Sequence, residues 1–324
     1  MLVIPHKTRK KASNCFYNLA ESNASQDALS VKPFVKWAGG KGQLLKEIQK
    51  IYPAGLGKIY TKYAEPFVGG GAVLFDVLSK HTLQEVYISD VNKELISTYI
   101  AIRDALKDLV ILLEIFHNEY NELNLEMRKK YYYKKRNLYN FIKINKNKNT
   151  EIECAALFIF LNKTCFNGLY RVNINGIFNV PMGTYKNPLI YDSENLHNIS
   201  QKLQNVHITC SDYRYSESFI DEKTFVYFDP PYRPITRTSN FTAYTEKSFD
   251  DNAQIELSEY VNYLSSKGAK IIVSNADPKN SNTKDEFIDR LYANYHIDRV
   301  QATRMINSNS MARGKINELL IRNF

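Results

Sequence analysis

An acid, two prolines and a tyrosine follow an apolar stretch late in the chain, at Asp229-Pro230-Pro231-Tyr232. An acid in this position lies at the carboxyl end of a strand, where open α/β sheets bind their ligands. The prolines lack N–H donors, so their carbonyls remain as acceptors. We expect Asp229 and the Pro230 carbonyl to hold the two hydrogens of an exocyclic amine, with the Tyr232 ring stacked on a base flipped out of its duplex. A simple turn after the strand is the alternative.

A second group of residues is suited to hold a nucleoside. Gly69-Gly70-Gly71 lies between a predicted strand and an apolar helix, so the backbone can approach a ligand closely. Leu74 stands where the dinucleotide fingerprint needs its third glycine, which disfavours a pyrophosphate. Asp90 ends the next predicted strand, where its carboxylate can accept hydrogen bonds from ribose hydroxyls. The spacing predicts nucleoside binding, with a glycine turn and a helix cap as the alternative.

The segment Trp37-Ala38-Gly39-Gly40-Lys41 is a third candidate. It is not a phosphate loop, because Val35 and Gly42 stand where such a loop has glycine and a hydroxyl residue. Its glycines can instead place the only Trp of the chain and Lys41 beside a ligand. A buried Trp next to a surface Lys is the alternative.

The elements that must position these residues alternate between strands and helices. We expect strands over 60–66, 85–90, 206–210, 225–228, 270–274, 295–300 and 318–322, and helices over 43–48, 92–120, 155–161 and 251–266. This order predicts a parallel sheet. Turn signals at Asn167-Gly168 and Asn175-Gly176 predict a β-hairpin over 169–180. The predicted fold is one α/β sheet interrupted by a helical, basic insert that carries the hairpin.

Charge and composition narrow the partners of this chain of 324 residues with a net charge of +9. Residues 127–150 contain nine basic residues, four tyrosines and no acid, and residues 1–12 contain four basic residues and no acid. Rings interleaved with cations are typical of nucleic-acid binding, and a solvated basic face is the alternative. The sequence has no apolar run of the roughly 18 residues that a membrane helix needs. Four scattered Cys predict a cytoplasmic protein without a metal site or disulfide framework.

Six segments share their order along the chain with one known family: 37–41, 66–71, 89–92, 167–173, 178–181 and 229–232. In these segments the sequence resembles the Dam-type DNA adenine-N6 methyltransferases of the alpha group, and most closely the GATC-modifying enzymes of DpnII-type restriction systems. The likeness spans 32–324. It implies a Rossmann-like, S-adenosylmethionine-dependent methyltransferase fold of the α/β class, with an inserted helical and β-hairpin DNA-recognition domain.

The resemblance also implies roles for individual residues. Catalysis would rest on Asp229, Pro230 and Tyr232. S-adenosylmethionine would be bound by Trp37, Lys41, Phe67, Gly69, Gly71, Asp90, Asp212, Tyr213 and Asp229. Family members more often have Gly-Asp-Phe where this chain has Ser211-Asp212-Tyr213.

For double-stranded DNA, the resemblance implies contacts from the element at 166–185. The residues are Phe166, Asn167, Leu169, Arg171, Pro181 and Tyr185. Arg171 can make a bidentate contact with a guanine, and Phe166 can wedge or stack where the base leaves. Some relatives have Arg where Thr184 stands.

Together these observations predict three parts: a flexible basic extension over 1–31, a catalytic domain over 32–105 and 205–324, and a target-recognition insert over 106–204. The predicted function is methyl transfer from S-adenosylmethionine to N6 of a flipped-out adenine in GATC. We expect a monomer that acts in a restriction-modification system beside a cognate endonuclease. The alternatives are an orphan regulatory DNA adenine methyltransferase, a methyltransferase of RNA or of a protein amide, and a DNA-binding protein without activity.

Overall fold

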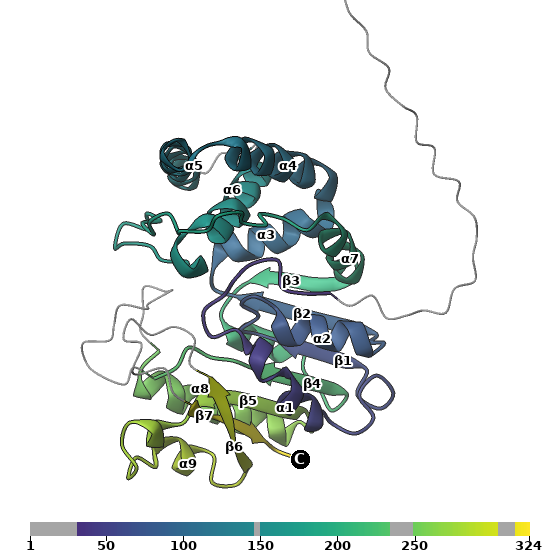
Figure 1. The fold of residues 1–324 in the computed structure, drawn as a ribbon. Coiled ribbons are helices and arrows are strands. Elements are labelled where there is room, and N and C mark those ends of the chain that lie inside the picture. The colour runs from purple at the N-terminus through teal and green to yellow at the C-terminus, as the bar shows by residue number, and fades with distance from the viewer. Residues whose placement is uncertain (1–30, 146–149, 234–248, 304–314) are drawn as a thin grey trace, which may run out of the picture.

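The computed structural model describes residues 31–145, 150–233, 249–303 and 315–324. A seven-stranded sheet, with strands in the order β3-β2-β1-β4-β5-β7-β6, forms its centre (Figure 1). The strands are β1 (Lys62–Glu65), β2 (Glu85–Asp90), β3 (Val206–Cys210), β4 (Thr224–Phe228), β5 (Lys270–Ala276), β6 (His296–Thr303) and β7 (Lys315–Arg322). β1 to β5 pair in parallel, and β7 is antiparallel to both β5 and β6. All seven predicted strands and the α/β class are confirmed, and the predicted parallel pairing holds for β1 to β5 but not for β6 and β7.

The middle of the sheet is its most buried part. All five residues of β4 are buried, as expected for a strand covered on both faces. The chain runs outward from β1 to β2 and β3, then returns to β4 on the other side of β1. This reversal is a topological switch point, where α/β sheets of this kind bind ligands beyond the carboxyl ends of their strands. The segments that follow β1 and β4 therefore meet at one edge.

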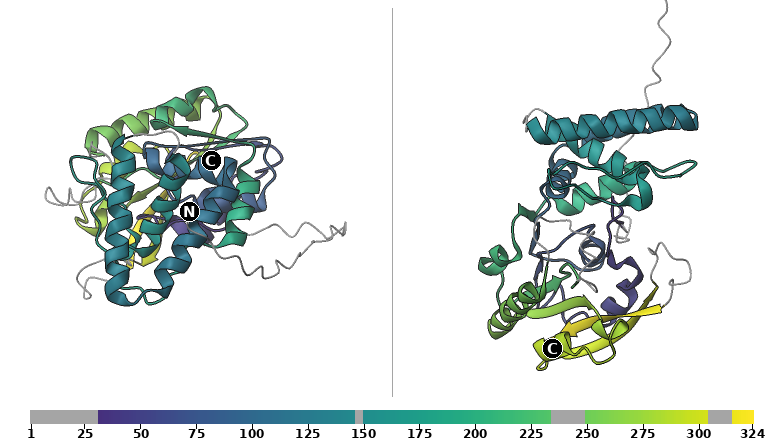
Figure 2. Two further views of the ribbon diagram at one scale, coloured as in Figure 1. Left: turned by 90° about the horizontal axis from the view of Figure 1, so that it is seen from above. Right: turned by 90° about the vertical axis from the view of Figure 1, so that its left-hand side faces the viewer.

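Helices cover the sheet and extend past its β3 edge (Figure 1). They are α1 (Leu45–Lys50), α2 (Ala72–Lys80), α3 (Lys93–Asp104), α4 (Leu106–Glu122), α5 (Leu125–Asn145), α6 (Glu151–Thr164), α7 (Ser193–Leu203), α8 (Asp251–Ser266) and α9 (Phe287–Leu291). α6 is buried along most of its length because α3, α4 and α5 all pack against it. Figure 2 shows α4, α5 and α6 gathered at one end of the molecule. No helix in the described ranges is long and apolar enough to span a membrane.

The predicted helix over 92–120 is wrong in one respect, because it is broken at Ala105 (φ −137°, ψ 35°). α3 ends there and α4 begins. The last carbonyls of a helix need new partners. The Arg103 carbonyl accepts hydrogen bonds from Gln204 Nε2 at 3.1 Å and Ser200 Oγ at 3.4 Å, both from the α7 region. These contacts stabilise the break.

The predicted hairpin over 169–180 forms a single bridge, between Val172 and Phe178, instead of two paired strands. Two backbone bonds join its arms, from Asn173 N to the Ile177 carbonyl at 2.9 Å and from Asn179 N to the Arg171 carbonyl at 3.2 Å. Side chains of α5 bind backbone groups that face away from this pairing. Asn140 Oδ1 accepts from Phe178 N at 2.9 Å, and Asn140 Nδ2 donates to Phe178 O at 3.0 Å. Tyr132 Oη donates to Val180 O at 2.9 Å. The element is therefore a minimal hairpin, shorter than predicted, that is fixed to α5.

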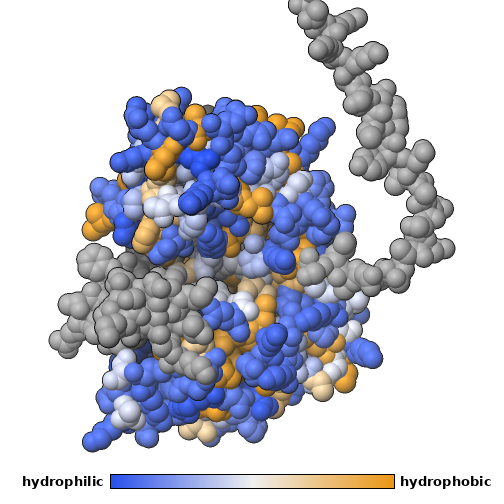
Figure 3. Space-filling model, in the orientation of Figure 1, coloured by the Kyte–Doolittle hydropathy of each residue, from blue (hydrophilic) through white to orange (hydrophobic). Residues whose placement is uncertain are grey.

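The division into domains stays a prediction. Residues 1–30 of the predicted extension lie outside the described ranges. Its last residue, Val31, is buried in the core at 7% exposure. The view in Figure 3 shows a mainly hydrophilic surface over the helices above the sheet, with smaller apolar patches.

Candidate active site

A buried lysine joins two of the predicted motifs. The Lys41 side chain, in the 3-10 turn η1 (Lys41–Gln43), is 4% exposed and places Nζ 2.7 Å from Asp229 Oδ1. Nζ also donates to the Gly39 carbonyl at 2.7 Å and lies 3.9 Å from Glu318 Oε2. The same Asp229 oxygen accepts from Ser274 Oγ of β5 at 2.9 Å. One oxygen of Asp229 is therefore fixed by two donors.

The remaining acceptors of this loop are open. Within the described residues, no group donates to Asp229 Oδ2 or to the Pro230 carbonyl. The Pro231 carbonyl does have a partner, Gln254 Nε2 of α8 at 3.2 Å, and Gln254 Oε1 accepts from Asn275 Nδ2 at 2.9 Å. Both amide side chains are buried. The segment 229–231 is thus fixed through Asp229 Oδ1 and the Pro231 carbonyl. Asp229 Oδ2 and the Pro230 carbonyl, which we expect to bind an amine, are not used for this.

Glu65 at the end of β1 is a buried carboxyl group that the sequence predictions missed. It accepts a hydrogen bond from Tyr63 Oη at 2.6 Å. Burial, and after it the nearby charge of Asp229, raises the pKa of Glu65 well above its ordinary value, although the bond from Tyr63 opposes the shift. Lys41 has two carboxylates within 4 Å, those of Asp229 and Glu318, and the formal charges of these three side chains sum to one negative charge.

Asp90 holds the glycine loop closed. Its Oδ2 accepts from Gly69 N at 3.1 Å, and its Oδ1 accepts from Asn92 N at 2.9 Å. Burial raises the pKa of Asp90, while the backbone donors oppose the shift. A carboxylate oxygen has two lone-pair positions. The Asp90 carboxylate can therefore still accept a hydrogen bond from a ribose hydroxyl through a lone pair that its backbone donors leave open.

The glycines are required by the protein's own packing. Gly69 (φ +48°) lies under the indole, so a Cβ there would be 2.8 Å from Trp37 Cδ1. Gly71 (φ +74°) caps α2, and a Cβ there would be 2.5 Å from Tyr99 Oη. Left-handed φ values already favour glycine. The sequence predicts that a ligand lies close to the backbone of this loop. At Gly69, the group that lies close to the backbone is the Trp37 ring.

Trp37 links the glycine loop to the predicted DNA-binding element. Its ring stacks on Tyr170, with centroids 5.9 Å apart and planes at 23°. Just before it, Lys36 N donates to Asn162 Oδ1 at 2.8 Å, and Asn162 Nδ2 donates back to the Lys36 carbonyl at 2.8 Å. The same Nδ2 also reaches the Gly168 carbonyl at 2.9 Å. These contacts hold residues 36–37 against the predicted DNA-binding element.

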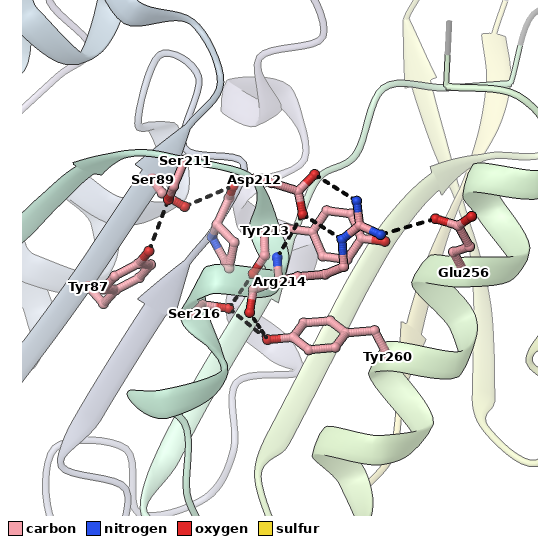
Figure 4. A network of polar contacts seen from close by, with 10 residues as sticks. Tyr87, Ser89, Ser211, Asp212, Tyr213, Arg214, Ser216, Glu256 and Tyr260 are labelled. Carbon is pink, nitrogen blue, oxygen red and sulfur yellow. Dashed lines mark hydrogen bonds and ion pairs between the residues drawn. The ribbon is translucent and has the colours of Figure 1, made fainter. Parts of the chain in front are cut away.

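Two of the residues that the resemblance assigns to the cofactor, Phe67 and Tyr213, lie in contact. The Phe67 and Tyr213 rings stack with centroids 5.3 Å apart and planes at 29°. Tyr213 opens the turn η4 (Tyr213–Ser218), which Asp212 caps by accepting from Arg214 N at 3.0 Å. Figure 4 shows that the Asp212 carboxylate also pairs with the Arg214 guanidinium, at 2.8 Å, and that this guanidinium reaches Glu256. The Asp212 carboxylate is therefore already engaged within the protein.

The six predicted DNA contacts lie on one loop. Phe166 is 49% exposed in the turn η3 (Phe166–Gly168), and Asn167 takes a left-handed conformation with φ 55°. Phe166 N donates to the Pro181 carbonyl at 2.9 Å, which joins the two halves of the loop. Arg171 is exposed and Leu169 is half-buried. Tyr185 lies beneath Lys36, whose Nζ is 4.1 Å from the ring centroid.

The basic segment is an amphipathic helix, α5, and part of its charge is used inside the protein. Arg128 donates to the carbonyls of Tyr120, Asn121 and Lys186. Lys143 pairs with Glu94 at 3.0 Å. The predicted binding of nucleic acid by this segment therefore has fewer free cations to draw on than its charge count suggests.

Two more basic residues of α5 face inward. Lys135 Nζ lies 3.9 Å from the Phe116 ring centroid, and Arg136 donates to the Val180 carbonyl at 3.3 Å. Lys129, Lys130 and Lys134 are exposed. Lys130 pairs with Glu126 on the surface, and such exposed pairs contribute little. Lys146 and Lys148 lie outside the described residues.

The exposed lysines of α5 allow a test of DNA contact that spares the fold. We expect the triple variant K129Q/K130Q/K134Q to reduce the slope of log affinity against log salt by up to about 2.7, because each lost phosphate contact removes about 0.9. Fluorescence anisotropy with a labelled duplex at several salt concentrations measures the slope.

A matched control removes three exposed lysines elsewhere, Lys46 on α1 and Lys58 and Lys223 before β1 and β4. The last two precede the amino ends of their strands, the edge opposite the candidate site. The control K46Q/K58Q/K223Q loses the same net charge and should keep the wild-type slope. Equal slopes in both triple variants would show that the exposed face of α5 is only solvated.

Three polar residues around the segment 229–232 were not predicted from the sequence: Ser274, Gln254 and Glu318. Only some of them carry a sequence signal that could have identified them. Ser274 follows three apolar residues of β5, as Asp229 follows β4, so the same pattern could have found it. Gln254 is a polar residue inside a helix and carries no local signal. Glu318 lies on the antiparallel strand β7, and only the sheet order brings it to the site.

Comparison with known proteins gives consistent matches. The sequence profile described as D12 class N6 adenine-specific DNA methyltransferase matches residues 37–306, which include Trp37, Asp90, Arg171 and Asp229. The type II methyltransferase M.MjaIII of Methanocaldococcus jannaschii is 46% identical, over 91% of this chain and 100% of that protein. The type II methyltransferase M1.LlaDCHI of Lactococcus lactis subsp. cremoris is 36% identical, over 95% and 99%. The DNA adenine methylase of Escherichia coli K12 is 34% identical, over 89% and 94%.

Proposed function

Because the chain belongs to the D12 class of N6 adenine-specific DNA methyltransferases, we propose that it transfers a methyl group from S-adenosylmethionine to an adenine flipped out of duplex DNA. Membership confirms the predicted resemblance and enzyme class. The observation that carries the finer proposal is the state of Asp229. Lys41 and Ser274 hold its Oδ1, while Oδ2 and the Pro230 carbonyl lack partners among the described residues. Two open acceptors suit the two hydrogens of one amine.

The charges at this edge fit the proposed methyl donor. When bound, S-adenosylmethionine supplies an electrophilic sulfonium methyl group. Lys41, Asp229 and Glu318 sum to one negative charge, which favours a cationic ligand. Asp90 offers lone pairs to a ribose, and Phe67 with Tyr213 offers an aromatic wall to an adenine. The proposed binding set is Trp37, Lys41, Phe67, Gly69, Gly71, Asp90, Asp212, Tyr213 and Asp229.

The residues after β4 then act on the target amine. An adenine amine is a weak nucleophile because its lone pair is delocalised into the ring. Hydrogen bonds to Asp229 Oδ2 and the Pro230 carbonyl favour a pyramidal nitrogen whose lone pair is available. The Tyr232 ring stacks on the base and holds it against these acceptors. Lys41 and Ser274 keep the Asp229 carboxylate from rotating away.

We further propose GATC as the target and a restriction-modification system as the context. The target rests on the resemblance of the loop at 166–185, and 106–204 is the proposed target-recognition insert. The context is supported by the two relatives named type II methyltransferases, which are 46% and 36% identical. A cognate endonuclease is the proposed partner, and a monomer the proposed form.

Methyl transfer from labelled S-adenosylmethionine to matched substrates tests this proposal. The substrates are a GATC duplex, the same duplex with deoxyinosine in place of the target adenines, and an RNA duplex of the same sequence. Deoxyinosine lacks the exocyclic amine that would accept the methyl group. We expect label in the GATC duplex alone. Label only in RNA would contradict the proposal and favour an RNA methyltransferase.

Arg171 allows a test of how the target is read. Its Nε donates to Asn179 Oδ1 at 2.8 Å, which orients the guanidinium on an exposed loop. A bidentate pair with guanine is worth roughly 1–3 kcal/mol of discrimination, or about 5- to 150-fold. We expect R171A to relax specificity, so that substrates altered at one guanine lose most of their penalty. Methylation rates on GATC and on four single-substitution variants measure this. A uniform drop across all five would indicate a phosphate contact instead.

A further inference from the structure

We propose that Glu318 is a positioning residue that holds the ring of Tyr232 in place for the target base. The inference rests on the proposed role of the segment 229–232. Tyr232 Oη donates a hydrogen bond to Glu318 Oε2 at 2.8 Å. The Glu318 side chain is only 15% exposed, so water competes weakly for this bond.

The sheet explains why a residue so far along the chain reaches the site. β7 inserts between β5 and β6, and its register places Glu318 opposite Ala276 on one side and Val300 on the other. Ala276 is the last residue of β5. Glu318 therefore lies at the carboxyl edge of the parallel strands, where Asp229 and Tyr232 follow β4. Side chains alternate along a strand, and the next residue, Leu319, is fully buried in the core.

The phenol remains a hydrogen-bond donor under ordinary conditions. Burial, together with the charges of Asp229 and Glu318, raises the pKa of Tyr232 well above its usual value. A neutral phenol can donate only along its O–H bond, so an acceptor at one place fixes the ring from its far end. Pro231 restricts the backbone on the other side. With both ends fixed, the ring keeps its plane before any base arrives, which is the preorganisation that fast transfer needs.

Glu318 also lies near Lys41. Its negative charge could therefore affect the site through Lys41 as well as through the hydrogen bond from Tyr232. Its Oε2 is 3.9 Å from Lys41 Nζ, at the outer limit of an ion pair, whereas Asp229 Oδ1 is at 2.7 Å. Lys41 Nζ lies 4.8 Å from the Tyr232 ring centroid. The shorter and directional contact is the one from Tyr232. Glu318→Gln separates the two effects, because the amide keeps an acceptor oxygen and loses the charge.

The test measures kcat and KM for a GATC duplex with E318A, E318Q, Y232F and the double variant Y232F/E318A. We expect E318A and Y232F each to lower kcat by about 10- to 100-fold, as small misplacements of positioning groups do. The double variant should be no slower than the slower single variant, because both changes break one bond. E318Q should stay within about threefold of wild type, and KM should change little in all four.

A fluorescent base gives a second readout. With 2-aminopurine in place of the target adenine, emission rises when the base leaves the stack and falls when a ring stacks on it. We expect the bound duplex to be brighter with E318A than with wild type or E318Q. The control is Glu217→Ala, which removes a bond of the same kind, from Tyr263 Oη at 2.8 Å, on the exposed surface between η4 and α8. It should leave kcat and emission unchanged.

Several outcomes would overturn the inference. Wild-type kcat in E318A or Y232F would show that the bond does not matter. An E318Q loss as large as that of E318A would assign the effect to charge, and multiplied losses in the double variant would show independent roles. If E318A fails to fold, Y232F and E318Q decide by the same criteria. A wild-type protein that does not methylate adenine would instead contradict the proposed function, whatever the variants do.

Discussion

Asp229→Asn should lower the rate of methyl transfer by about 10²- to 10³-fold, the usual scale for removing one preorganised polar group from a reacting centre. The direction follows from the partners of the carboxylate. Lys41 and Ser274 both donate to Oδ1, so the amide oxygen of Asn would take that position. Its NH2 group would then occupy the Oδ2 position and present a donor to the hydrogens of the target amine. Single-turnover methylation of a GATC duplex measures the loss.

Asn is a cleaner substitution than Ala at this position. Ala would leave Lys41, whose side chain is 4% exposed, without its nearest carboxylate. Breaking a buried pair in this way costs roughly 3–5 kcal/mol, here reduced by the remaining contacts of Lys41 with Gly39 and Glu318. The control is Ser274→Ala, which keeps the carboxylate and should cost less than about tenfold. Near-native turnover of folded D229N would remove Asp229 from the mechanism.

Asp90→Ala should weaken the binding of S-adenosylhomocysteine by about ten- to a hundredfold, because charge-assisted hydrogen bonds are worth roughly 1.5–3 kcal/mol. The loss has two sources: the contacts to a ribose, and the bond from Gly69 N that keeps the glycine loop closed. DNA affinity should change much less, because the predicted DNA contacts lie on another loop. Calorimetric titration gives the first affinity and anisotropy the second.

Asn92→Ala is the matched control for this prediction. Asn92 lies two residues further on and caps α3 by accepting from Leu95 N at 2.9 Å. Its loss should reduce stability by about 1 kcal/mol and leave ligand affinity nearly unchanged. If D90A binds S-adenosylhomocysteine as tightly as wild type does, the end of β2 does not bind a nucleoside.

The strands and the main motif residues were predictable because each carries a local signal. An apolar run that ends in an acid marks both β2 with Asp90 and β4 with the Asp229 that follows it. Parallel order then brings such ends to one edge without knowledge of side-chain contacts. Lys41 was assigned from resemblance, and its pair with Asp229 confirms that the two segments meet.

The features that were missed depend on contacts between distant elements. The break at Ala105 depends on side chains from the α7 region, and the attachment of the hairpin to α5 depends on Asn140 and Tyr132. Counting basic residues in the sequence does not show which of them are engaged within the protein. Arg128 donates to three backbone carbonyls, whereas Lys129 is exposed. Glu318 reaches the site only because β7 inserts between β5 and β6.

The most direct test of the central claim is to map the methylated bases. The purified protein is incubated with S-adenosylmethionine and an unmethylated plasmid, which is then sequenced by a method that detects N6-methyladenine, with D229N as the parallel control. We predict N6-methyladenine at GATC sites with the wild type and none with D229N. Methyl groups on cytosine, on adenines outside any common sequence, or equally with both proteins would contradict it.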